Sequence, residues 1–228
     1  MPKILRAAVL GGVVLLVAAA APGAWAQPRE LPAQLVTVSG VAELYRKDTP
    51  TWVSATLRAD VGEGDSLRTL LGGRVTIRTA SGQALRLGSR SQIAVMASDG
   101  AAASPGPTRI RLDSGWLWVA VTPGSPAPTQ IEVRAGPAVV TVYGAGVGIR
   151  RSADGALLVQ VHHGTAMCEG PDRQWERKLT GPQQLLVPAS GIPAQPVVLA
   201  VDPSEVTWVR WNAEQDLAGG YGGGPIKP

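Results

Sequence analysis

Between Leu35 and Val187 the sequence is built from short runs in which apolar and polar residues alternate, separated by glycine-containing turns. Alternation with a period of two places successive side chains on opposite faces of a β-sheet, whereas an amphipathic helix needs apolar residues three and four positions apart. The clearest run is Gly73–Thr79, in which Val75 and Ile77 alternate with arginine and threonine. Because almost no helical periodicity interrupts the pattern, the sequence predicts an all-β domain.

Three pairs of runs are predicted to form β-hairpins. Their strands are Gly73–Thr79 with Ala84–Leu87, Ile110–Leu112 with Trp116–Val121, and Val147–Arg151 with Ala156–His162. The intervening turns contain Ser81-Gly82, Asp113-Ser114-Gly115 and Asp154-Gly155, which favour tight reversals of the chain. Further strands are expected at Leu35–Val38, Val41–Tyr45, Ile131–Arg134, Val139–Tyr143, Thr165–Cys168, Gln174–Leu179 and Gln184–Val187.

About twelve strands are therefore expected within residues 35–190, at a spacing of roughly 8–12 residues. This spacing is typical of a multi-stranded sandwich, a jelly-roll-like domain or a β-roll of short hairpins. The sequence does not distinguish a sandwich from a β-roll or a short β-helix, since all three produce alternating strands and glycine turns.

One α-helix is predicted near the C-terminus, over Pro203–Leu217 within a linker-and-helix segment 191–218. Asp202 is a suitable N-cap before a proline at the first helical position, and Glu205 completes a start like a capping box. The glycine-rich segment 219–228 follows and is expected to be disordered.

Tryptophan is the main aromatic residue, since the chain has seven tryptophans and no phenylalanine. Trp116 and Trp118 share one strand face and suit either a core ladder or a platform for stacking carbohydrate. Trp208 and Trp211 lie three positions apart on the predicted helix, so they share a side and are expected to dock it on the sheet. If this pair is exposed instead, it marks a partner-facing site.

The N-terminus has the three parts of a secretory signal peptide. A basic start, Met1–Arg6, precedes the apolar stretch Ala7–Ala21, and small residues end the segment at Ala26. We expect cleavage between Ala26 and Gln27, export to the periplasm, and no stable membrane span afterwards, because the apolar stretch is shorter than a spanning helix needs. The alternative is that this segment stays uncleaved as an inner-membrane anchor.

Charge and metal-binding residues exclude several classes of function. Without residues 1–26, which carry two of the 21 basic residues, the balance is 19 − 17 = +2, which is too near neutral to indicate nucleic-acid binding. Cys168 is the only cysteine, so no intramolecular disulfide is expected. The only histidines, His162 and His163, are adjacent on a predicted strand, and because neighbouring residues point to opposite faces we expect no shared metal ion. No cofactor or catalytic motif is recognised, so no catalytic residue is assigned.

Two surface features remain as binding candidates. Five arginines are predicted to face outward: Arg74, Arg78, Arg86, Arg109 and Arg111. A charged, solvated sheet face is the favoured interpretation, and the alternative is a basic stripe for an acidic glycan, lipid head group or chelate. The Gly144–Gly148 run is consistent with an anion cradle, although a bent strand is favoured since no helix follows it.

The order and spacing of the strand-and-turn phrases resemble the FecR domain family over about Val36–Val187. The phrases include Gly64-Asp65-Ser66-Leu67-Arg68-Thr69, Leu112-Asp113-Ser114-Gly115-Trp116-Leu117-Trp118 and Val159-Gln160-Val161-His162-His163-Gly164. The turn positions that carry the resemblance are Gly64, Asp65, Thr69, Gly82, Gly115, Gly144 and Gly164. Two departures are Gly144–Ile149, where the family has Gly-Thr-x-Phe-x-Val, and His163, where it has an acidic residue.

The resemblance implies a regulator of the bacterial envelope. Signalling members of the family carry a cytoplasmic anti-sigma region before a transmembrane helix, whereas only six residues precede the apolar stretch here. We therefore expect a stand-alone exported binding module that recognises an envelope protein or a small ligand, and no enzyme. One alternative is a membrane-anchored regulator of iron-type signalling between a TonB-dependent receptor and a sigma factor. Another is an enzyme acting on envelope polysaccharide.

Overall fold

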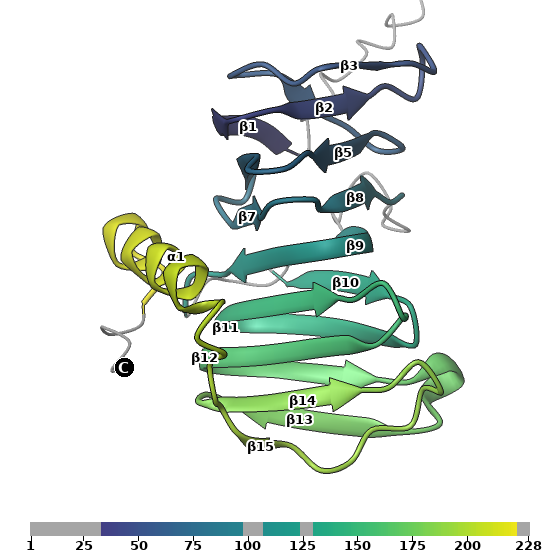
Figure 1. Ribbon diagram of the computed structural model, residues 1–228, viewed down its shortest axis with the longest axis vertical. Helices are drawn as coiled ribbons and strands as arrows, with labels where there is room; N and C mark the ends of the chain where they lie inside the picture. The colour runs from purple at the N-terminus through teal and green to yellow at the C-terminus, as the bar shows by residue number, and fades with distance from the viewer. Residues whose placement is uncertain (1–32, 98–106, 124–129, 223–228) are drawn as a thin grey trace, which may run out of the picture.

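A computed structural model describes residues 33–97, 107–123 and 130–222 of the chain (Figure 1). One continuous sheet of 15 strands forms almost the whole structure, and a single α-helix follows it. The predicted fold class, all-β with one C-terminal helix, is confirmed. The predicted signal peptide and the cleavage site at Ala26 and Gln27 lie outside the described residues.

The sheet folds over into two layers because its three longest strands are bent and pair differently along their two halves. These strands are β9 (Thr108–Ala120), β11 (Ala138–Arg151) and β12 (Leu157–Glu169). Residues 108–114 of β9 pair with β8 (Gln92–Val95) and β10 (Ile131–Ala135), whereas residues 115–120 pair with β7 (Ala84–Leu87) and β11. Each long strand thus belongs to both layers.

The remaining strands belong to one layer each. The first layer also contains β2 (Ala42–Tyr45), β3 (Trp52–Ser54), β5 (Ser66–Thr69) and β13 (Glu176–Thr180). The second layer also contains β1 (Ala33–Ser39), β4 (Asp60–Val61), β6 (Arg74–Thr79), β14 (Gln183–Val187) and β15 (Val197–Val198). A 3₁₀ turn, η1 (Pro171–Arg173), precedes β13. The fold is a two-layered, sandwich-like arrangement, one of the architectures that the sequence left open.

Two of the three predicted hairpins are present. Strands β6 and β7 pair antiparallel across residues 80–83, and the second half of β11 pairs with the first half of β12 across residues 152–156. The predicted hairpin at Asp113-Ser114-Gly115 is wrong, because β9 continues through this point as one strand. Gly115 has a φ of +81° and bends the strand into the other layer instead of reversing it.

Glycine is also required where β12 passes from one layer to the other. Gly164 has a φ of +77°, and a Cβ atom there would lie only 2.2 Å from the carbonyl oxygen of Gly144. We expect Gly164→Ala to lower the free energy of unfolding by about 2 kcal/mol, since backbone strain and overpacking add together. Urea denaturation measures this loss.

Gly72→Ala is the matched control for that substitution. Gly72 has a similar φ of +73°, but no atom lies within 4 Å of the position that a Cβ atom would take there. Gly72→Ala should therefore lower the free energy of unfolding by about 1 kcal/mol, through backbone strain alone. Equal losses in the two variants would contradict a packing role for Gly164.

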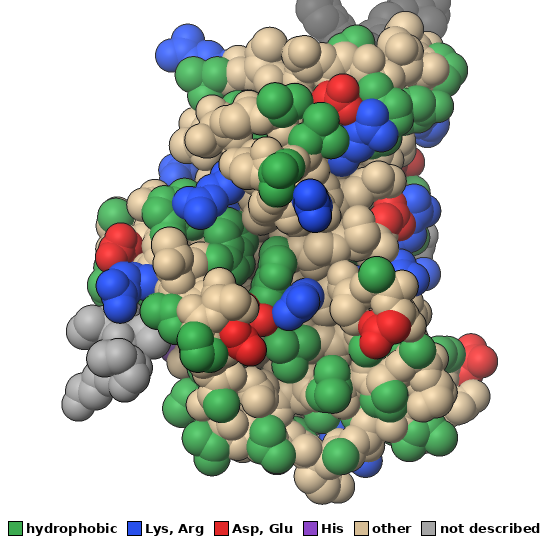
Figure 2. All heavy atoms as spheres, viewed as in Figure 1, with side chains coloured by type: hydrophobic (Ala, Val, Ile, Leu, Met, Phe, Trp, Pro, Cys, Tyr) green, Lys and Arg blue, Asp and Glu red, His purple; other side chains and the backbone are tan. Residues whose placement is uncertain are grey.

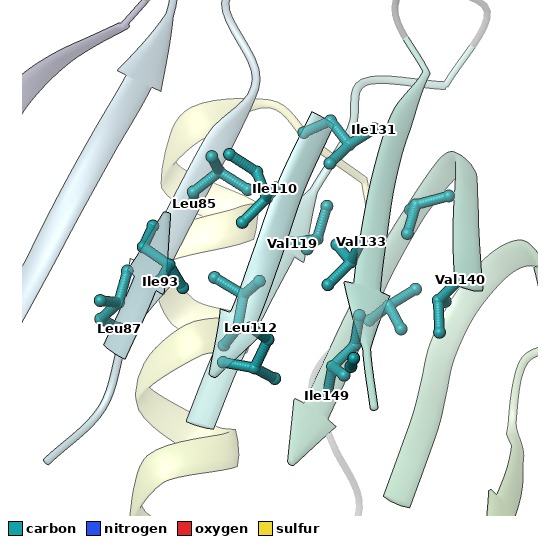
Figure 3. Close-up of a cluster of buried hydrophobic side chains, with 14 of the residues drawn as sticks. Leu85, Leu87, Ile93, Ile110, Leu112, Val119, Ile131, Val133, Val140 and Ile149 are labelled. Atoms are coloured by element: carbon teal, nitrogen blue, oxygen red, sulfur yellow. The ribbon is translucent and has the colours of Figure 1, made fainter. Parts of the chain in front are cut away.

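The hydrophobic core fills the space between the two layers. Leu85, Leu87, Val119 and Ile149 of the second layer meet residues of the first layer that include Ile93, Ile110, Leu112, Ile131, Val133 and Val140 (Figure 3). These side chains are at most 1% exposed. The alternation in the sequence therefore predicted the inward positions of β7 and of the first half of β9 correctly, whereas β8, which contains Ile93, was not predicted as a strand.

The helix α1 (Val206–Gly219) starts three residues later than predicted. Asp202 accepts hydrogen bonds from the backbone N–H and hydroxyl of Ser204 at 2.8 and 2.6 Å, so it shapes a turn ahead of the helix. Gly220 ends the helix with a φ of +73°, as its position predicts. Within the described residues, no helix is both long and apolar enough to cross a membrane.

The expected disorder from residue 219 onward is corrected for the part of this segment that is described. Tyr221 is only 3% exposed, and its hydroxyl donates a hydrogen bond of 2.7 Å to the carbonyl oxygen of Gly82. The aromatic side chain therefore anchors the end of α1 on the β6–β7 turn. Residues 223–228 lie outside the described part of the chain.

Candidate functional site

The outer face of the second layer, where α1 lies against the sheet, holds the largest group of buried polar side chains that the structure describes (Figure 1). On the helix, the buried residues are Val209, Asn212 and Asp216, spaced three and four positions apart. Two of these three are polar, so a small apolar cluster with Trp118 and Tyr221 provides only part of the contact. We call this contact the helix seam.

Asp216 is the centre of the helix seam. Its Oδ1 atom accepts a hydrogen bond of 2.5 Å from Nη1 of Arg86, and its Oδ2 atom accepts one of 2.9 Å from the indole N–H of Trp118. The side chains of Arg86 and Asp216 are 3% and 1% exposed. A buried ion pair of this kind fixes the helix in one position, because a carboxylate moved away from its partners leaves an unpaired buried charge behind.

Arg86 was predicted as an exposed, partner-facing residue, and this prediction is wrong. Arg86 does point away from the core between the layers, but α1 covers it. Strand periodicity assigns a side chain to a face of the sheet and contains no information about a distant segment that packs on that face. Asp216 itself was not predicted, although its spacing from Val209 and Asn212 places all three on one side of a helix.

A second ion pair lies at the beginning of α1. Glu205 Oε1 is 2.9 Å from Nη1 of Arg150, and Glu205 Oε2 is 3.5 Å from Nε2 of Gln160. Burial raises the pKa of Glu205, and the nearby positive charge of Arg150 partly opposes that effect. Glu205 was predicted to complete a capping box, but it makes no side-chain hydrogen bond to the helix backbone and ties the helix to β11 and β12 instead.

His162 and His163 both lie on the side of the sheet that α1 covers, contrary to the prediction of opposite faces. A register shift between β11 and β12 at Gly146 interrupts the alternation at this point. The His162 ring packs on Trp118 with 4.7 Å between centroids, and His163 Nε2 is 3.7 Å from Oδ2 of Asp216. Among the described residues, no group of three or more His, Cys, Asp or Glu side chains is arranged to hold a metal ion.

Burial lowers the pKa of His162 to about 4, and the neighbouring His163 contributes in the same direction, while Asp216 opposes it. His162 is therefore a neutral ring at physiological pH. Burial also raises the pKa of the Cys168 thiol to about 12, so this cysteine is an inert core residue and not a nucleophile.

The two predicted tryptophans of α1 lie beside the helix seam. The rings of Trp208 and Trp211 are stacked with 5.5 Å between centroids, and both are half-buried. The guanidinium carbon of Arg74 lies 5.9 and 5.6 Å from the two ring centroids. The pair thus lines the edge of the helix–sheet contact, whose buried centre is made by Asp216 and its neighbours.

The tryptophans of β9 differ from each other in environment. Trp118 is 1% exposed beneath α1, which supports the core interpretation over a carbohydrate platform for this residue. Trp116 is half-buried, with the Arg150 guanidinium carbon 5.3 Å from its ring centroid. The two rings therefore do not form one exposed platform.

The five arginines of the alternative basic stripe do not lie on one surface. Arg74, Arg78 and Arg86 project from β6 and β7 of the second layer, and Arg109 and Arg111 from the first-layer half of β9. Arg109 lies 3.4 Å from Glu132, and Arg111 lies 2.7 Å from Asp113, so both are in ion pairs. The alternative of one stripe is corrected to separate arginines on two opposite outer faces.

The turn residues that carry the family resemblance have structural roles. Asp65 is 6% exposed and accepts hydrogen bonds from the backbone N–H groups of Gly62 and Lys47 at 2.9 and 3.0 Å. Thr69 donates from its hydroxyl to the carbonyl oxygen of Gly88 at 2.5 Å. Gly64, Gly82 and Gly144 have φ values of +86°, +86° and +50°. These residues hold the corners between strands and do not converge on one site.

A shallow groove of about 330 Å³ lies on the first layer beside the Gly64 turn. Lys47, Glu63, Met96 and Arg111 are among its lining residues, and Glu63 is the one carboxylate among them. Glycoside hydrolysis generally uses two carboxyl groups that face each other across the bond. Among the described residues that line the groove, two carboxyl groups facing each other in this way are not found.

Comparison with known proteins supports the resemblance over part of the chain. The sequence profile of the family described as "FecR protein" matches residues 65–167, which run from β5 to the second half of β12. The predicted resemblance to the FecR domain is thus confirmed for this segment. No curated protein matches the chain significantly.

Two crystal structures share the fold, and both are of a candidate anti-sigma factor from Parabacteroides distasonis, at 2.50 and 1.65 Å resolution. Each is 16% identical to this chain with a TM-score of 0.50. The similarity covers 64% of this chain and 64% of the first structure, and 68% and 74% for the second. At this identity the similarity is one of fold.

Proposed function

We propose that this protein is an exported FecR-type binding module of the bacterial envelope, acting in signalling through a protein partner rather than as an enzyme. The single observation that carries the proposal is the FecR match at residues 65–167, which contains the sheet strands that hold α1. The anti-sigma description of the two similar structures favours a regulatory role. In the second form of this hypothesis, the module binds a small envelope ligand instead of a protein.

The chemistry of the helix seam and of the buried Cys168 in the core supports binding rather than catalysis. Asp216, Glu205 and Arg86 have their charges paired within the protein, and the Cys168 thiol is buried and protonated. A catalytic group must reach substrate with a suitable protonation state. Residues that hold a helix on a sheet instead provide a rigid scaffold for recognition.

The proposed partner is tested by crosslinking in the native host. The full chain, carrying an affinity tag, is expected to crosslink reproducibly to one envelope protein. Deleting the gene for the chain itself should change transcription of genes controlled by an alternative sigma factor. Deletion that changes the length of envelope polysaccharide, with no crosslinked protein, would favour the enzyme hypothesis and overturn this proposal.

Export is part of the proposal and has its own test. After expression in a Gram-negative host, the intact mass should correspond to a chain starting at Gln27, and the protein should fractionate with the periplasm. Replacing Ala26 with a large residue should block processing, because a signal peptidase needs a small side chain at that position. An uncleaved wild-type chain in the membrane fraction would instead support the anchored regulator of iron-type signalling.

A further inference from the structure

We propose that the partner binds at the corner where β5 leads into β6, together with the adjacent tryptophans of α1, and that it presents an acidic segment with a neighbouring apolar side chain. We call this region the corner surface, and it consists of Val41, Leu70, Leu71, Arg74, Trp208 and Trp211. The proposal rests on the proposed function and adds the place and the chemistry of recognition.

The tip of the corner surface is apolar and exposed. Leu71 is 72% exposed, Val41 54% and Leu70 42%. Val41 and Leu70 are adjacent in space, because the N–H of Leu70 donates a hydrogen bond of 2.9 Å to the carbonyl oxygen of Val41. Three exposed aliphatic side chains together cost solvation free energy in the free protein, which a partner that covers them would recover.

A cationic and aromatic region continues from this tip. Arg74 follows Leu71 by three residues, and its guanidinium lies over the stacked Trp208 and Trp211 rings. Within the described part of the chain, Arg74 forms no ion pair with a carboxylate, in contrast to Arg86 on the next strand. Tryptophan and arginine dominate the binding energy of many protein interfaces. An unpaired guanidinium held on aromatic rings is complementary to a carboxylate.

Exposed Arg90 adds a second cation to the same corner, since its backbone N–H donates a hydrogen bond of 3.2 Å to the carbonyl oxygen of Leu70. Gly88, two residues earlier, lies against one of the two tryptophans: a Cβ atom there would be 3.6 Å from the Trp208 ring. The aliphatic tip of the corner surface is thus connected to its tryptophans through residues 88–90. Two arginines near three aliphatic side chains fit a segment that has both acidic and apolar residues. Figure 2 shows one face of the molecule, on which Lys and Arg side chains lie among hydrophobic ones.

The rigidity of the corner favours a protein partner over a membrane. The N–H of Gly72 donates to the Ser89 hydroxyl at 2.9 Å, and the N–H of Gly73 donates to the carbonyl oxygen of Leu70 at 3.0 Å. Trp208 and Trp211 are half-buried and stacked, whereas residues that anchor a protein in a bilayer must project into it. A preorganised surface loses little entropy when it binds a partner of matching shape.

The test is selection of binding peptides by the purified full chain from a phage-displayed library of random peptides. We expect enrichment of sequences that combine aspartate or glutamate with an aromatic or aliphatic residue. Leu71→Ser and Arg74→Glu should each weaken binding of the synthesised peptides at least tenfold in fluorescence anisotropy. Trp211→Ala should do the same if the variant keeps the wild-type melting temperature.

Matched control variants change residues of the same types elsewhere. Leu186→Ser alters an apolar residue of β14 that is 60% exposed, and Arg173→Glu alters an arginine whose side chain is 81% exposed. Both should bind the selected peptides as the wild type does. Equal losses in the control and corner variants would overturn the proposal.

Three other outcomes would also overturn it: enrichment of peptides without acidic residues, no enrichment at all, and Arg74-dependent binding to phosphatidylglycerol vesicles without peptide binding. Failure of the proposed function is distinguishable from these results. If the crosslinked envelope protein still binds the Leu71→Ser and Arg74→Glu variants with wild-type affinity, the binding module stands and only the corner surface is wrong.

Discussion

Replacing Asp216 with alanine is expected to lower the free energy of unfolding by about 3–5 kcal/mol, the usual cost of removing one partner from a buried ion pair. The variant leaves the Arg86 guanidinium, which is 3% exposed, without its carboxylate, and it leaves the Trp118 indole N–H without an acceptor. If α1 detaches before the sheet unfolds, the loss is limited to the free energy of docking. Urea denaturation gives the global value, and hydrogen exchange of residues 206–219 reports detachment.

Two further variants make this expectation specific to the ion pair. Glu214 is exposed on the same helix, so Glu214→Ala should change stability by no more than about 0.5 kcal/mol. The double variant Arg86→Met with Asp216→Leu removes both charges and should recover most of the loss, because apolar residues of similar volume often replace a buried pair at little cost. A loss as large in the double variant as in Asp216→Ala would show that the charge left unpaired is not the cause.

The hairpins that were predicted correctly have local causes. Strands β6 and β7 are close in sequence, and alternation within Val75, Ile77, Leu85 and Leu87 determines both the faces and the pairing. The predicted hairpin at Asp113-Ser114-Gly115 is wrong because a glycine after Asp and Ser is equally suited to a tight turn and to a bend in a continuous strand. Pairing with β8 and β11, which lie elsewhere in the sequence, decides between the two conformations.

The helix seam could not have been predicted from strand patterns. Arg86 and Asp216 are separated by 130 residues, and nothing in the neighbourhood of either one indicates the other. An arginine at an outward strand position is compatible with water, an ion pair or a covering helix, so period-two alternation does not distinguish these environments. The glycine at the end of α1 is a local signal, so the end of the helix was predicted correctly. The residues that α1 contacts are distant in the sequence and were not predicted.

The histidines show how one irregular residue changes a prediction about chemistry. Strict alternation placed His162 and His163 on opposite faces, and the register shift opposite Gly146 places both beside α1. A bulge depends on the partner strand as well as on the sequence that contains it. The same irregularity buries His162 against Trp118, which determines how the protein responds to pH.

Stability is expected to fall by about 3 kcal/mol as the pH decreases from about 6.5 to about 4, through His162 alone. The pKa of His162 is lowered from 6.5 to about 4 in the folded protein. Between these values the unfolded chain binds a proton that the folded protein does not, so acid favours the unfolded state. The stabilisation by the neutral ring is complete above pH 6.5 and is lost progressively below it.

Three carboxyl groups with shifted pKa values affect stability in acid differently from His162. The raised pKa of Glu205 makes the folded protein take up a proton more readily, which opposes the loss due to His162. The pKa values of Asp154 and Asp202 are lowered from 3.8, so their contributions are lost at more acidic pH than most of the His162 effect. A decline that begins near pH 6.5 is therefore not caused by these three carboxyl groups.

His162→Phe tests this assignment because it keeps an aromatic ring against Trp118 and removes the titrating group. Urea denaturation at a series of pH values should show a nearly flat stability between pH 6.5 and 4.5 for this variant. His163→Gln should keep most of the wild-type slope, since burial is the main cause of the lowered pKa of His162 and the neighbouring histidine is the lesser one. If His162→Phe retained the wild-type slope, the protonation of another group would control the docking of α1 in acid, and the neutral ring beneath the helix would have only a packing role.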